Sequence, residues 1–536
     1  MNTKVTERLW ARDATLWKTD DASVKIINNS LGWLTVADEM LGVAGELTEF
    51  AESIRARGFQ HVMVCGMGGS SLCPEVLAQT FGQQPGFPEL LVLDSTDPDV
   101  IAAFAARIDV ERCLFIIASK SGSTTEPNVF QKFWYEEVRK RRENPGDNFI
   151  AITDSGSPLV ETASELKFER TFLNQADIGG RYSALSYFGM VPAALMGLDV
   201  RRLLESAQSA VRSADASFGI DIGDNALAGR DKLTLVIDPS LATLGLWIEQ
   251  LIAESTGKEG KGILPVNGES LGGPEVYGDD RLFVSVSLGA LAGETKTKLD
   301  ALSAAGHPIA YRQVENFYDL GAEFFAWEFA TACAGWRLGI NPFDQPNVQE
   351  AKDATKELLS SFARRGRLDE RITIATDDVI TIYGAEEQGY GSVQEVLCAH
   401  LATVKPGDYI AFLNYIEETT GVDEVLQELR TQLRDATKCA VTVGYGPRFL
   451  HSTGQLHKGG PDTGVFFQII ANDATDFAIP GEEYTFSILK QAQALGDFRA
   501  LARRGRRVIG IDLRDNTLEG LVAVKRLVGV ALRGRP

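Results

Sequence analysis

Short apolar runs rich in β-branched residues alternate with helix-like segments from about residue 60 onward, and this alternation restricts the possible folds more than any other feature. Such alternation is typical of βαβ units, in which helices cover both faces of a parallel sheet. Two series of strands are predicted, at 61–65, 90–94, 113–119 and 149–154, and then at 232–238, 282–289 and 307–314. A third series of apolar runs falls between residues 372 and 513.

The chain has 536 residues, which is too long for a single hydrophobic core. We therefore expect an α/β protein with two parallel-sheet α/β/α sandwiches and a third α/β module. The expected units are N-terminal helices with the first sandwich at 1–225, the second sandwich at 226–370, and the C-terminal module at 371–536.

Charge and composition exclude several classes of partner. With 53 basic and 73 acidic residues the formal net charge is -20, which disfavours nucleic acid or an anionic membrane as a partner. No apolar stretch reaches the roughly 18 residues that cross a bilayer, and the N-terminus lacks the apolar core of a secretory signal. The six cysteines contain no CxxC pair, which argues against a metal site or a disulfide framework. We expect a cytoplasmic protein that uses neither a metal nor a cofactor.

A glycine-rich segment, GMGGSS at residues 66–71, follows the first predicted strand and precedes a helix. Glycines allow positive φ and let backbone amides approach a ligand, and a helix N-terminus offers free N–H groups. Gly69 and Ser70 are therefore candidate anion-binding residues. A turn without any ligand remains the alternative, because the segment does not match the dinucleotide pattern GxGxxG.

A second segment, SKSGSTTEP at residues 119–127, is a more specific anion-binding candidate. It follows the predicted strand 113–119 and carries five hydroxyl side chains and one lysine. An N-cap requires a single hydroxyl, which Thr124 or Thr125 would supply, so the others point to a phosphate cradle. The candidate ligands are Ser119, Lys120, Ser121 and Thr124.

These two segments together resemble the paired signatures of sugar isomerase (SIS) domains. GGRYSALSYFG (179–189), ESTGKEGKG (254–262) and GINPFDQPNVQEAK (339–352) are further similar to the phosphoglucose isomerase family. The matches run in order from residue 60 to residue 352, and the sequence is most similar to the isomerase portion of bifunctional transaldolase/phosphoglucose isomerases. No transaldolase activity is implied, because the chain starts with the isomerase part.

The resemblance implies two SIS-type domains and an aldose–ketose isomerase of glycolysis and gluconeogenesis, which interconverts glucose 6-phosphate and fructose 6-phosphate. Two alternatives stay open: an isomerase that also accepts mannose 6-phosphate, and a non-catalytic protein that senses a phosphosugar. A protein that only senses a phosphosugar does not need Glu254, Lys352 and the GGR segment (179–181) together, so their joint presence counts against the sensor. The family also implies a homodimer, since a histidine from a second subunit commonly completes its sites.

Glu254 is the expected general base. Trp247, Leu251 and Glu254 fall at i, i+4 and i+7, so the carboxylate continues an apolar stripe of a predicted helix. It also lies in the last turn before Gly257, where the helix dipole disfavours the ionised form. The residues alone are equally compatible with a solvated glutamate at a helix end, and the resemblance to the family decides for the base.

Three further residues match active-site positions of the family. Arg181 follows Gly179 and Gly180, which leave space for a ligand beside the guanidinium, although a structural salt bridge is the alternative. The resemblance makes Lys352 the lysine that assists ring chemistry and Glu126 a further active-site acid, and it gives Gly180 a place among the binding residues.

The histidine departs from the family pattern. The family places its ring-opening histidine between the base and the lysine, where only His307 is present and lacks the expected motif. The segment LHSTGQ, which resembles the histidine motif of compact bacterial members, lies instead after the lysine and contains His451. We expect His451 to open the ring. His457 is a second candidate, and packing of the third module is the alternative for both.

Overall fold

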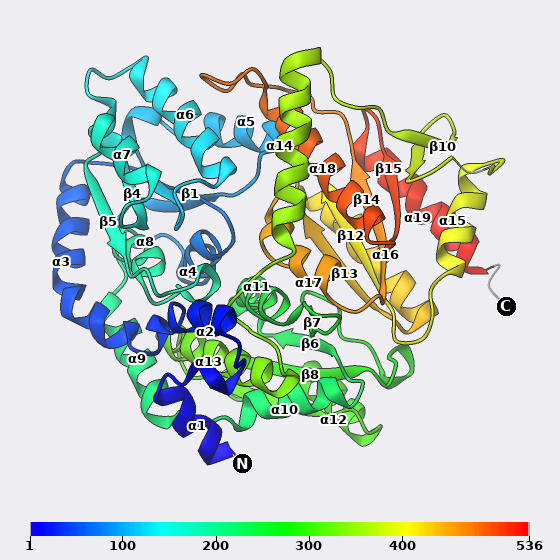
Figure 1. The fold of residues 1–536 in the computed structure, drawn as a ribbon, viewed down its shortest axis with the longest axis horizontal. Coiled ribbons are helices and arrows are strands. Elements are labelled where there is room, and N and C mark those ends of the chain that lie inside the picture. The colour runs from blue at the N-terminus through cyan, green and yellow to red at the C-terminus, as the bar shows by residue number, and fades with distance from the viewer. Residues whose placement is uncertain (1, 388, 534–536) are drawn as a thin grey trace.

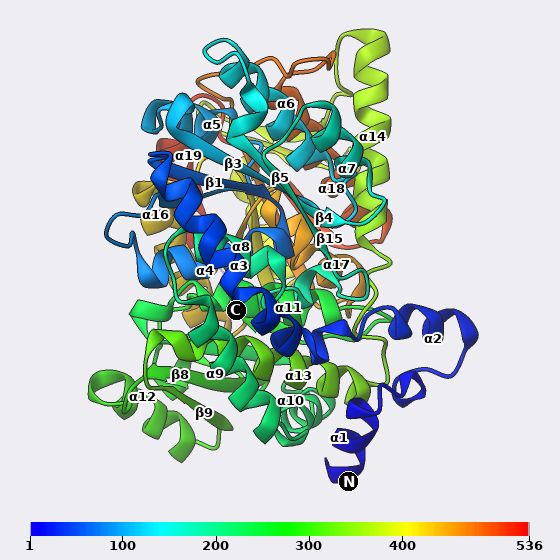
Figure 2. The same cartoon turned by 90° about the vertical axis from the view of Figure 1, so that its left-hand side faces the viewer.

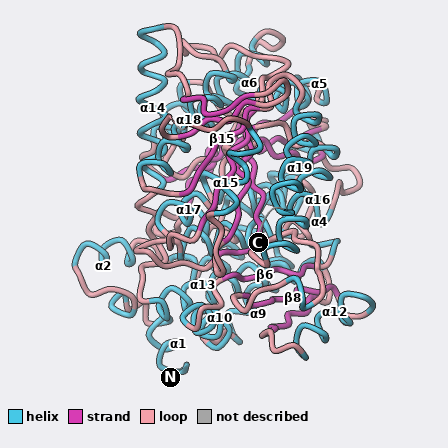
Figure 3. The backbone as a smooth tube through the Cα atoms, turned by 90° about the vertical axis from the view of Figure 1, so that its right-hand side faces the viewer, coloured by secondary structure: helices cyan, strands magenta, loops and turns pink. Residues whose placement is uncertain are grey.

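The computed structural model describes residues 2–387 and 389–533, and its strands form three separate sheets (Figure 1). The first sheet lies at the upper left of this view, the second at the bottom and the third at the right. Figure 3 shows from another side that strands β6 and β8 of the second sheet lie below strand β15 of the third. The architecture is a mixed α/β fold with parallel-sheet α/β/α units, as the sequence predicts.

The first sheet is parallel throughout and has the order β2-β1-β3-β4-β5. Its strands are β1 (His61–Gly66), β2 (Glu89–Leu93), β3 (Cys113–Ala118), β4 (Phe149–Asp154) and β5 (Arg170–Asn174). The helices that follow the strands of this sheet are α4 (Leu72–Phe81), α5 (Pro98–Arg107), α6 (Thr125–Arg139), α7 (Pro158–Glu165), α8 (Tyr187–Leu195) and α9 (Val200–Ser213).

The second sheet is also parallel and has the order β7-β6-β8-β9. Its strands are β6 (Lys232–Ile237), β7 (Leu264–Val266), β8 (Arg281–Leu288) and β9 (Ile309–Val314). Helices of this part of the chain are α10 (Ser217–Leu227), α11 (Leu244–Thr256), α12 (Gly293–Ala304), α13 (Leu320–Leu338) and α14 (Val348–Arg365). The long helix α14 crosses in front of the region where the first and third parts meet in Figure 1, and Figure 2 shows it at the edge of the molecule.

The third sheet has the order β10-β11-β15-β14-β12-β13, with two antiparallel pairings at one edge and parallel pairings elsewhere. Its strands are β10 (Ile372–Thr376), β11 (Thr381–Gly384), β12 (Tyr409–Tyr415), β13 (Ala440–Tyr445), β14 (Gly464–Ile470) and β15 (Arg507–Asp512). Its helices are α15 (Val393–Ala402), α16 (Thr420–Thr437), α17 (Gly454–Gly459), α18 (Phe486–Arg503) and α19 (Thr517–Arg533).

Three helices precede the first sheet: α1 (Asn2–Trp10), α2 (Asp21–Asn28) and α3 (Val36–Ala56). Helix α2 projects from the body of the molecule (Figure 2). No helix within the described residues is apolar over enough of its length to cross a membrane.

Burial on both faces explains why the parallel strands are continuous apolar runs. In β1, Val62 and Val64 belong to a core shared with α3 and α8, whereas Met63 and Cys65 belong to a core on the opposite face. This second core also contains Leu489 and other apolar residues of α18. The third module is therefore packed directly against the helices of the first sheet.

Three strands escaped prediction because their sequences lack the buried apolar run. Strand β7 has only three residues, β5 alternates buried with exposed positions, and β11 is a four-residue partner of the antiparallel edge. Helix α10 spans the first expected domain boundary and packs against α13. Where the domain boundaries fall stays a prediction.

Candidate functional site

The two hydroxyl-rich segments meet because their strands are neighbours. Strands β1 and β3 pair in parallel with Gly66 opposite Ala118, so both chains leave the sheet at the same edge. The strand order also reverses direction between β1 and β3, and ligands of open α/β sheets bind in the crevice at such a point. The topology of the first sheet therefore brings together the segments 66–71 and 119–124.

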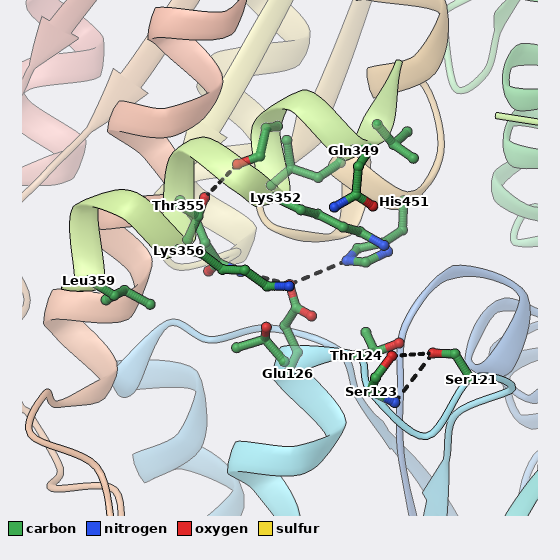
Figure 4. A pocket seen from close by; sticks show the side chains of 15 residues that line it. Ser121, Ser123, Thr124, Glu126, Gln349, Lys352, Thr355, Lys356, Leu359 and His451 are labelled. Atoms are coloured by element: carbon green, nitrogen blue, oxygen red, sulfur yellow. Dashed lines mark hydrogen bonds and ion pairs between the residues drawn. The ribbon is translucent and has the colours of Figure 1, made fainter. Parts of the chain in front are cut away.

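A pocket of about 490 Å³ opens at this edge. It is lined by eleven of the twelve residues that the sequence analysis proposed: Gly69, Ser70, Ser119, Lys120, Ser121, Thr124, Gly180, Arg181, Glu254, Lys352 and His451. The twelfth, Glu126, lies in an adjoining pocket that shares Thr124, Lys352 and His451 with the first (Figure 4). The structure thus gathers residues from the first sheet, α11, α14 and the third module.

The cradle hydroxyls bond to one another and leave the helix start uncapped. The Ser119 hydroxyl donates to Thr124 Oγ1 at 3.2 Å, and the hydroxyls of Ser121 and Ser123 lie 3.0 Å apart. Thr124 occupies the N-cap position of α6, as the sequence allowed, but its side chain makes no capping hydrogen bond. Ser70 hydrogen-bonds through its side chain to no described residue and lines the pocket. These hydroxyls and the α6 N-terminus can bind an anion.

Lys120 is already paired within the protein. Its ammonium contacts the carboxylate of Asp154 and donates to the carbonyl oxygen of Ala176 at 3.0 Å. Burial raises the pKa of Asp154, although the Lys120 partner opposes this shift. Lys120 therefore anchors the segment to β4 as well as lining the pocket.

The glycines of GMGGSS also serve contacts within the protein, beside the approach to a ligand that the sequence suggests. A Cβ on Gly69 would lie 2.0 Å from the carbonyl oxygen of Gly180, the residue before Arg181. Gly68 has a φ of +55°, and a Cβ there would lie 2.5 Å from the Gln250 side chain and 3.0 Å from the His451 carbonyl oxygen. The absence of side chains at Gly68 and Gly69 thus allows Gly180, Gln250 and His451 to lie close to the end of β1.

Glu254 lies in the last turn of α11, as predicted, with 9% of its surface exposed. Its stripe companions Trp247 and Leu251 are fully buried and fix the orientation of the helix. Gln250, one turn earlier, donates to Glu254 Oε2 at 3.1 Å and to the His451 carbonyl oxygen at 2.8 Å. One amide group therefore links the expected base to the backbone of the third module.

Arg181 is buried, with 4% of its surface exposed, and each nitrogen of its guanidinium has a protein partner. Its Nη1 lies 3.3 Å from Glu254 Oε1, which places a permanent cation beside the carboxylate. The hydrogen-bond acceptors of the guanidinium are Ser255 Oγ (2.7 Å), Gln345 Oε1 (2.9 Å) and the carbonyl oxygens of Pro342 (2.6 Å) and Asp344 (3.0 Å). Arg181 thereby both faces the pocket and joins the segment 342–345 to α11.

Glu126 and His451 form a buried pair across the two modules. His451 Nε2 lies 3.2 Å from Glu126 Oε1 (Figure 4). Burial alone would raise the pKa of Glu126, but the charge and hydrogen bond of His451, with Lys352 further away, hold that pKa below its ordinary value. The pair therefore favours an ionised carboxylate beside the imidazole.

The other histidines lie elsewhere. His457 is buried in the third module, where Nδ1 lies 2.9 Å from the Tyr409 hydroxyl and burial lowers its pKa. His307 packs against the rings of Tyr277 and Phe283 beside the second sheet. Of the three candidates, His451 alone lines the pocket of about 490 Å³.

Several pocket residues were missed by the sequence analysis. Gln250 stands four residues before Glu254, so helical spacing from the expected base could have found it. Asn29 and Ser30, which follow α2, and Gln493 of α18 gave no signal, since their positions depend on how distant segments pack.

Comparisons with known proteins show which proteins this chain is similar to. The family model described as phosphoglucose isomerase matches residues 35–221. A glucose-6-phosphate isomerase of Leptospira biflexa is 27% identical over 403 residues, which cover 64% of this chain and 89% of the relative. A glucose-6-phosphate isomerase of Heliobacterium modesticaldum is 28% identical over 372 residues, which cover 57% of this chain and 81% of the relative. A hypothetical protein of Thermus thermophilus shares the fold with a TM-score of 0.58 and 22% identity, covering 66% of this chain and 94% of its own. A glucose-6-phosphate isomerase structure from Chlamydia trachomatis has a TM-score of 0.51 and 21% identity, covering 67% and 78%.

We predict that Gly69→Ala lowers the free energy of unfolding by about 1–3 kcal/mol, the usual cost of overpacking, because the added methyl meets the Gly180 backbone. The midpoint of urea unfolding measures this. Gly180→Ala is the matched control, because a Cβ there has no atom within 4 Å. Equal midpoints for the two variants would contradict the close approach of the segments.

Proposed function

Because the chain belongs to the phosphoglucose isomerase family, we propose that it interconverts glucose 6-phosphate and fructose 6-phosphate, with the residues of the shared pocket as its catalytic and binding groups. The observation that carries the proposal is the convergence of Glu254, Arg181, Lys352 and the Glu126–His451 pair on two adjoining pockets lined by hydroxyl groups. An aldose–ketose isomerase needs an anchor for the phosphate, a group that opens the ring and a base that moves a proton between two carbons.

The phosphate is bound by the hydroxyls of Ser119, Ser121 and Thr124 at the start of α6, with Ser70 opposite. Uncapped backbone N–H groups and hydroxyl donors stabilise a phosphate without requiring a basic surface. This local arrangement accounts for how a chain of net charge -20 holds an anionic substrate. Gly69 and Gly180 keep the two sides of the pocket together.

Ring opening is assigned to His451, with Lys352 on the same side of the pocket. The imidazole gives a proton to the ring oxygen as the bond from C1 to that oxygen breaks, and the C1 hydroxyl passes its proton to solvent water as the carbonyl forms. Histidine exchanges protons readily near neutral pH. Glu126 holds the ring of His451 in place through the 3.2 Å contact.

Isomerisation of the open chain is assigned to Glu254. Its carboxylate removes the proton from C2 of the aldose and returns it to C1, so that an enediolate forms in between. Arg181 Nη1, 3.3 Å from Glu254 Oε1, lies beside the position where this negative charge develops and stabilises it without titrating. Burial of Arg181 and Glu254 strengthens that interaction.

We propose that one chain supplies all the catalytic groups and that a homodimer is not needed for the chemistry. His451 reaches the pocket from the chain's own third module, and its backbone oxygen is tied to Gln250 on α11. A cytoplasmic location is part of the same proposal, since the substrate is a cytoplasmic sugar phosphate.

The proposed function is tested by a coupled assay with glucose 6-phosphate and mannose 6-phosphate in parallel. We expect turnover of glucose 6-phosphate by the wild type, and Glu254→Gln should lower kcat by about 10²-fold or more, the scale of general base catalysis. The variant should still bind substrate, because the phosphate cradle is unchanged.

Glu249→Gln is the matched control, since Glu249 lies on the same helix α11, does not line the pocket, and has a pKa that burial raises to about 7. Turnover of mannose 6-phosphate at a comparable rate would widen the substrate class to both sugars. Binding without turnover by the wild type would instead support a sensor and contradict the isomerase.

The role of His451 is tested by comparing His451→Ala with His457→Ala. We expect His451→Ala to lower kcat for the cyclic substrate by at least about tenfold, the lower part of the range for acid–base groups, while slow spontaneous ring opening sustains a residual rate. A phosphorylated hydroxamate that mimics the open-chain enediolate should bind His451→Ala as tightly as the wild type.

His457→Ala serves as the second arm of this comparison. Its ring packs in the third module against Tyr409 and Phe466, so a loss of stability is expected without a specific loss of turnover in the folded fraction. A His451→Ala enzyme with the full rate would remove His451 from the mechanism.

A further inference from the structure

A buried chain of hydrogen bonds runs from the first sheet through the third module to His451. The Thr96 hydroxyl, in the loop after β2, donates to Gln493 Oε1 at 2.7 Å. Gln493 Nε2 on α18 then donates to Glu126 Oε1 at 2.6 Å, and the same oxygen lies 3.2 Å from His451 Nε2. Thr96 and Glu126 are buried, and Gln493 has 3% of its surface exposed.

The Glu126 carboxylate determines the direction of this chain, because an ionised carboxylate only accepts and so takes the amide nitrogen of Gln493. The amide oxygen of Gln493 then faces Thr96, whose hydroxyl donates to it. An amide nitrogen can only donate, so this contact favours a carboxylate that accepts, and a hydrogen bond to the charged form stabilises that form. Gln493 therefore acts on Glu126 without itself titrating.

The consequence reaches the imidazole of His451. A carboxylate that accepts hydrogen bonds takes the Nε2–H of the ring, which leaves Nδ1 for another partner. Among the described residues, the hydrogen bond of the His451 ring is made through Nε2, and the side chain lines the pocket. Nδ1 is therefore the nitrogen that is available to a bound molecule.

We infer that Gln493 is a positioning residue for the proposed isomerisation: by fixing Glu126 as the acceptor of His451 Nε2–H, it directs Nδ1 of the imidazole to the ring oxygen of the substrate. The inference rests on the proposed function and extends it to a residue on a separate helix of the third module. It assigns that module two tasks, since η10 (Arg448–His451) supplies the imidazole and α18 orients the acid that holds it.

The titratable groups around Glu126 come from several elements. They are His451 of η10, Lys352 and Lys356 of α14, Tyr415 of β12 and Tyr484 of the segment before α18. The two tyrosines keep raised pKa values because they are buried, so they stay neutral in the pH range of an assay. A change of pH profile on substitution of Gln493 is therefore attributable to the Glu126–His451 pair.

The test compares Gln493→Leu with Gln493→Glu across pH in the isomerase assay. Gln493→Leu removes the donor, and we expect kcat to fall about tenfold at every pH with KM within about twofold, because the substrate is still held by the cradle. In Gln493→Glu two carboxyl groups adjoin, so one of them holds a proton at low pH and can replace the amide donor.

The sign of the pH effect follows from this shared proton. The adjoining carboxylates raise the pKa of the pair, so the donor of Gln493→Glu is present below that pKa and is lost as pH rises through it. We expect the ratio of kcat in Gln493→Glu to kcat in the wild type to be highest at low pH and to fall as pH rises. The ratio for Gln493→Leu should stay low throughout.

Two further variants complete the experiment. Gln491→Glu is the matched control on the same helix, because the Gln491 side chain hydrogen-bonds to Ser487 and lines neither pocket of the site, so it should give a ratio near one at all pH values. Thr96→Val removes the hydroxyl that donates to the amide oxygen and should lower kcat about threefold, a partial form of the Gln493→Leu effect. It provides the same test if substitution of Gln493 prevents folding.

If the wild type isomerises glucose 6-phosphate, any of three results would overturn this inference and leave the proposed function standing. They are a wild-type kcat for Gln493→Leu, a kcat ratio for Gln493→Glu that does not change with pH, and a wild-type kcat for Thr96→Val. A wild type without isomerase activity would overturn the proposed function, and this inference with it.

Discussion

The pairing of Glu126 with His451 is the interaction on which the assembly of the site depends, because it joins α6 of the first sheet to the third module inside the pocket. Glu126 is buried, so its carboxylate requires hydrogen-bond partners, and the side chains of His451 and Gln493 that contact it both come from the third module. Loss of either module would leave a buried polar group unpaired. The contact thus couples the stability of the interface to the geometry of the site.

Other buried polar contacts reinforce the same interface. Arg448, three residues before His451, forms two hydrogen bonds of 2.8 Å with Asp94 at the end of β2. Asp94 also accepts from Ser71, in the glycine-rich segment, at 3.1 Å. Lys490 of α18 contacts Asp97 at 2.9 Å. The ion pairs Arg448–Asp94 and Lys490–Asp97 are largely shielded from water. Removing one partner would therefore leave the other as an unpaired buried charge, which destabilises the fold.

Much of the fold could be predicted from the sequence, because the parallel strands are buried on both faces and stand out as apolar runs. The convergence of segments 66–71 and 119–124 followed from the rule that parallel strands end at one edge. Glu254 could be placed on a buried helix face because Trp247 and Leu251 share its stripe.

The rest depended on packing between distant segments. Gln493 lies 367 positions from Glu126, and no local pattern indicates which helix of a third module will dock there. The meaning of Gly69 was equally hidden, because its neighbour is the backbone of Gly180. His451 follows Lys352 in the chain, contrary to the family order. The LHSTGQ segment alone was the basis for proposing that His451 lies in the pocket. No local sequence pattern indicates that the third module packs against the first sheet and so places His451 there.

In the proposed enzyme each chain assembles a whole site, with Glu254 and His451 contributed by the same molecule. This is measured by unfolding and refolding together two impaired variants, Glu254→Gln and His451→Ala, and assaying the mixture with glucose 6-phosphate. Complete sites within single chains predict activity no greater than the sum of the two variants refolded separately. Recovery of a substantial fraction of wild-type activity would show that His451 acts in the site of another subunit and would contradict the account.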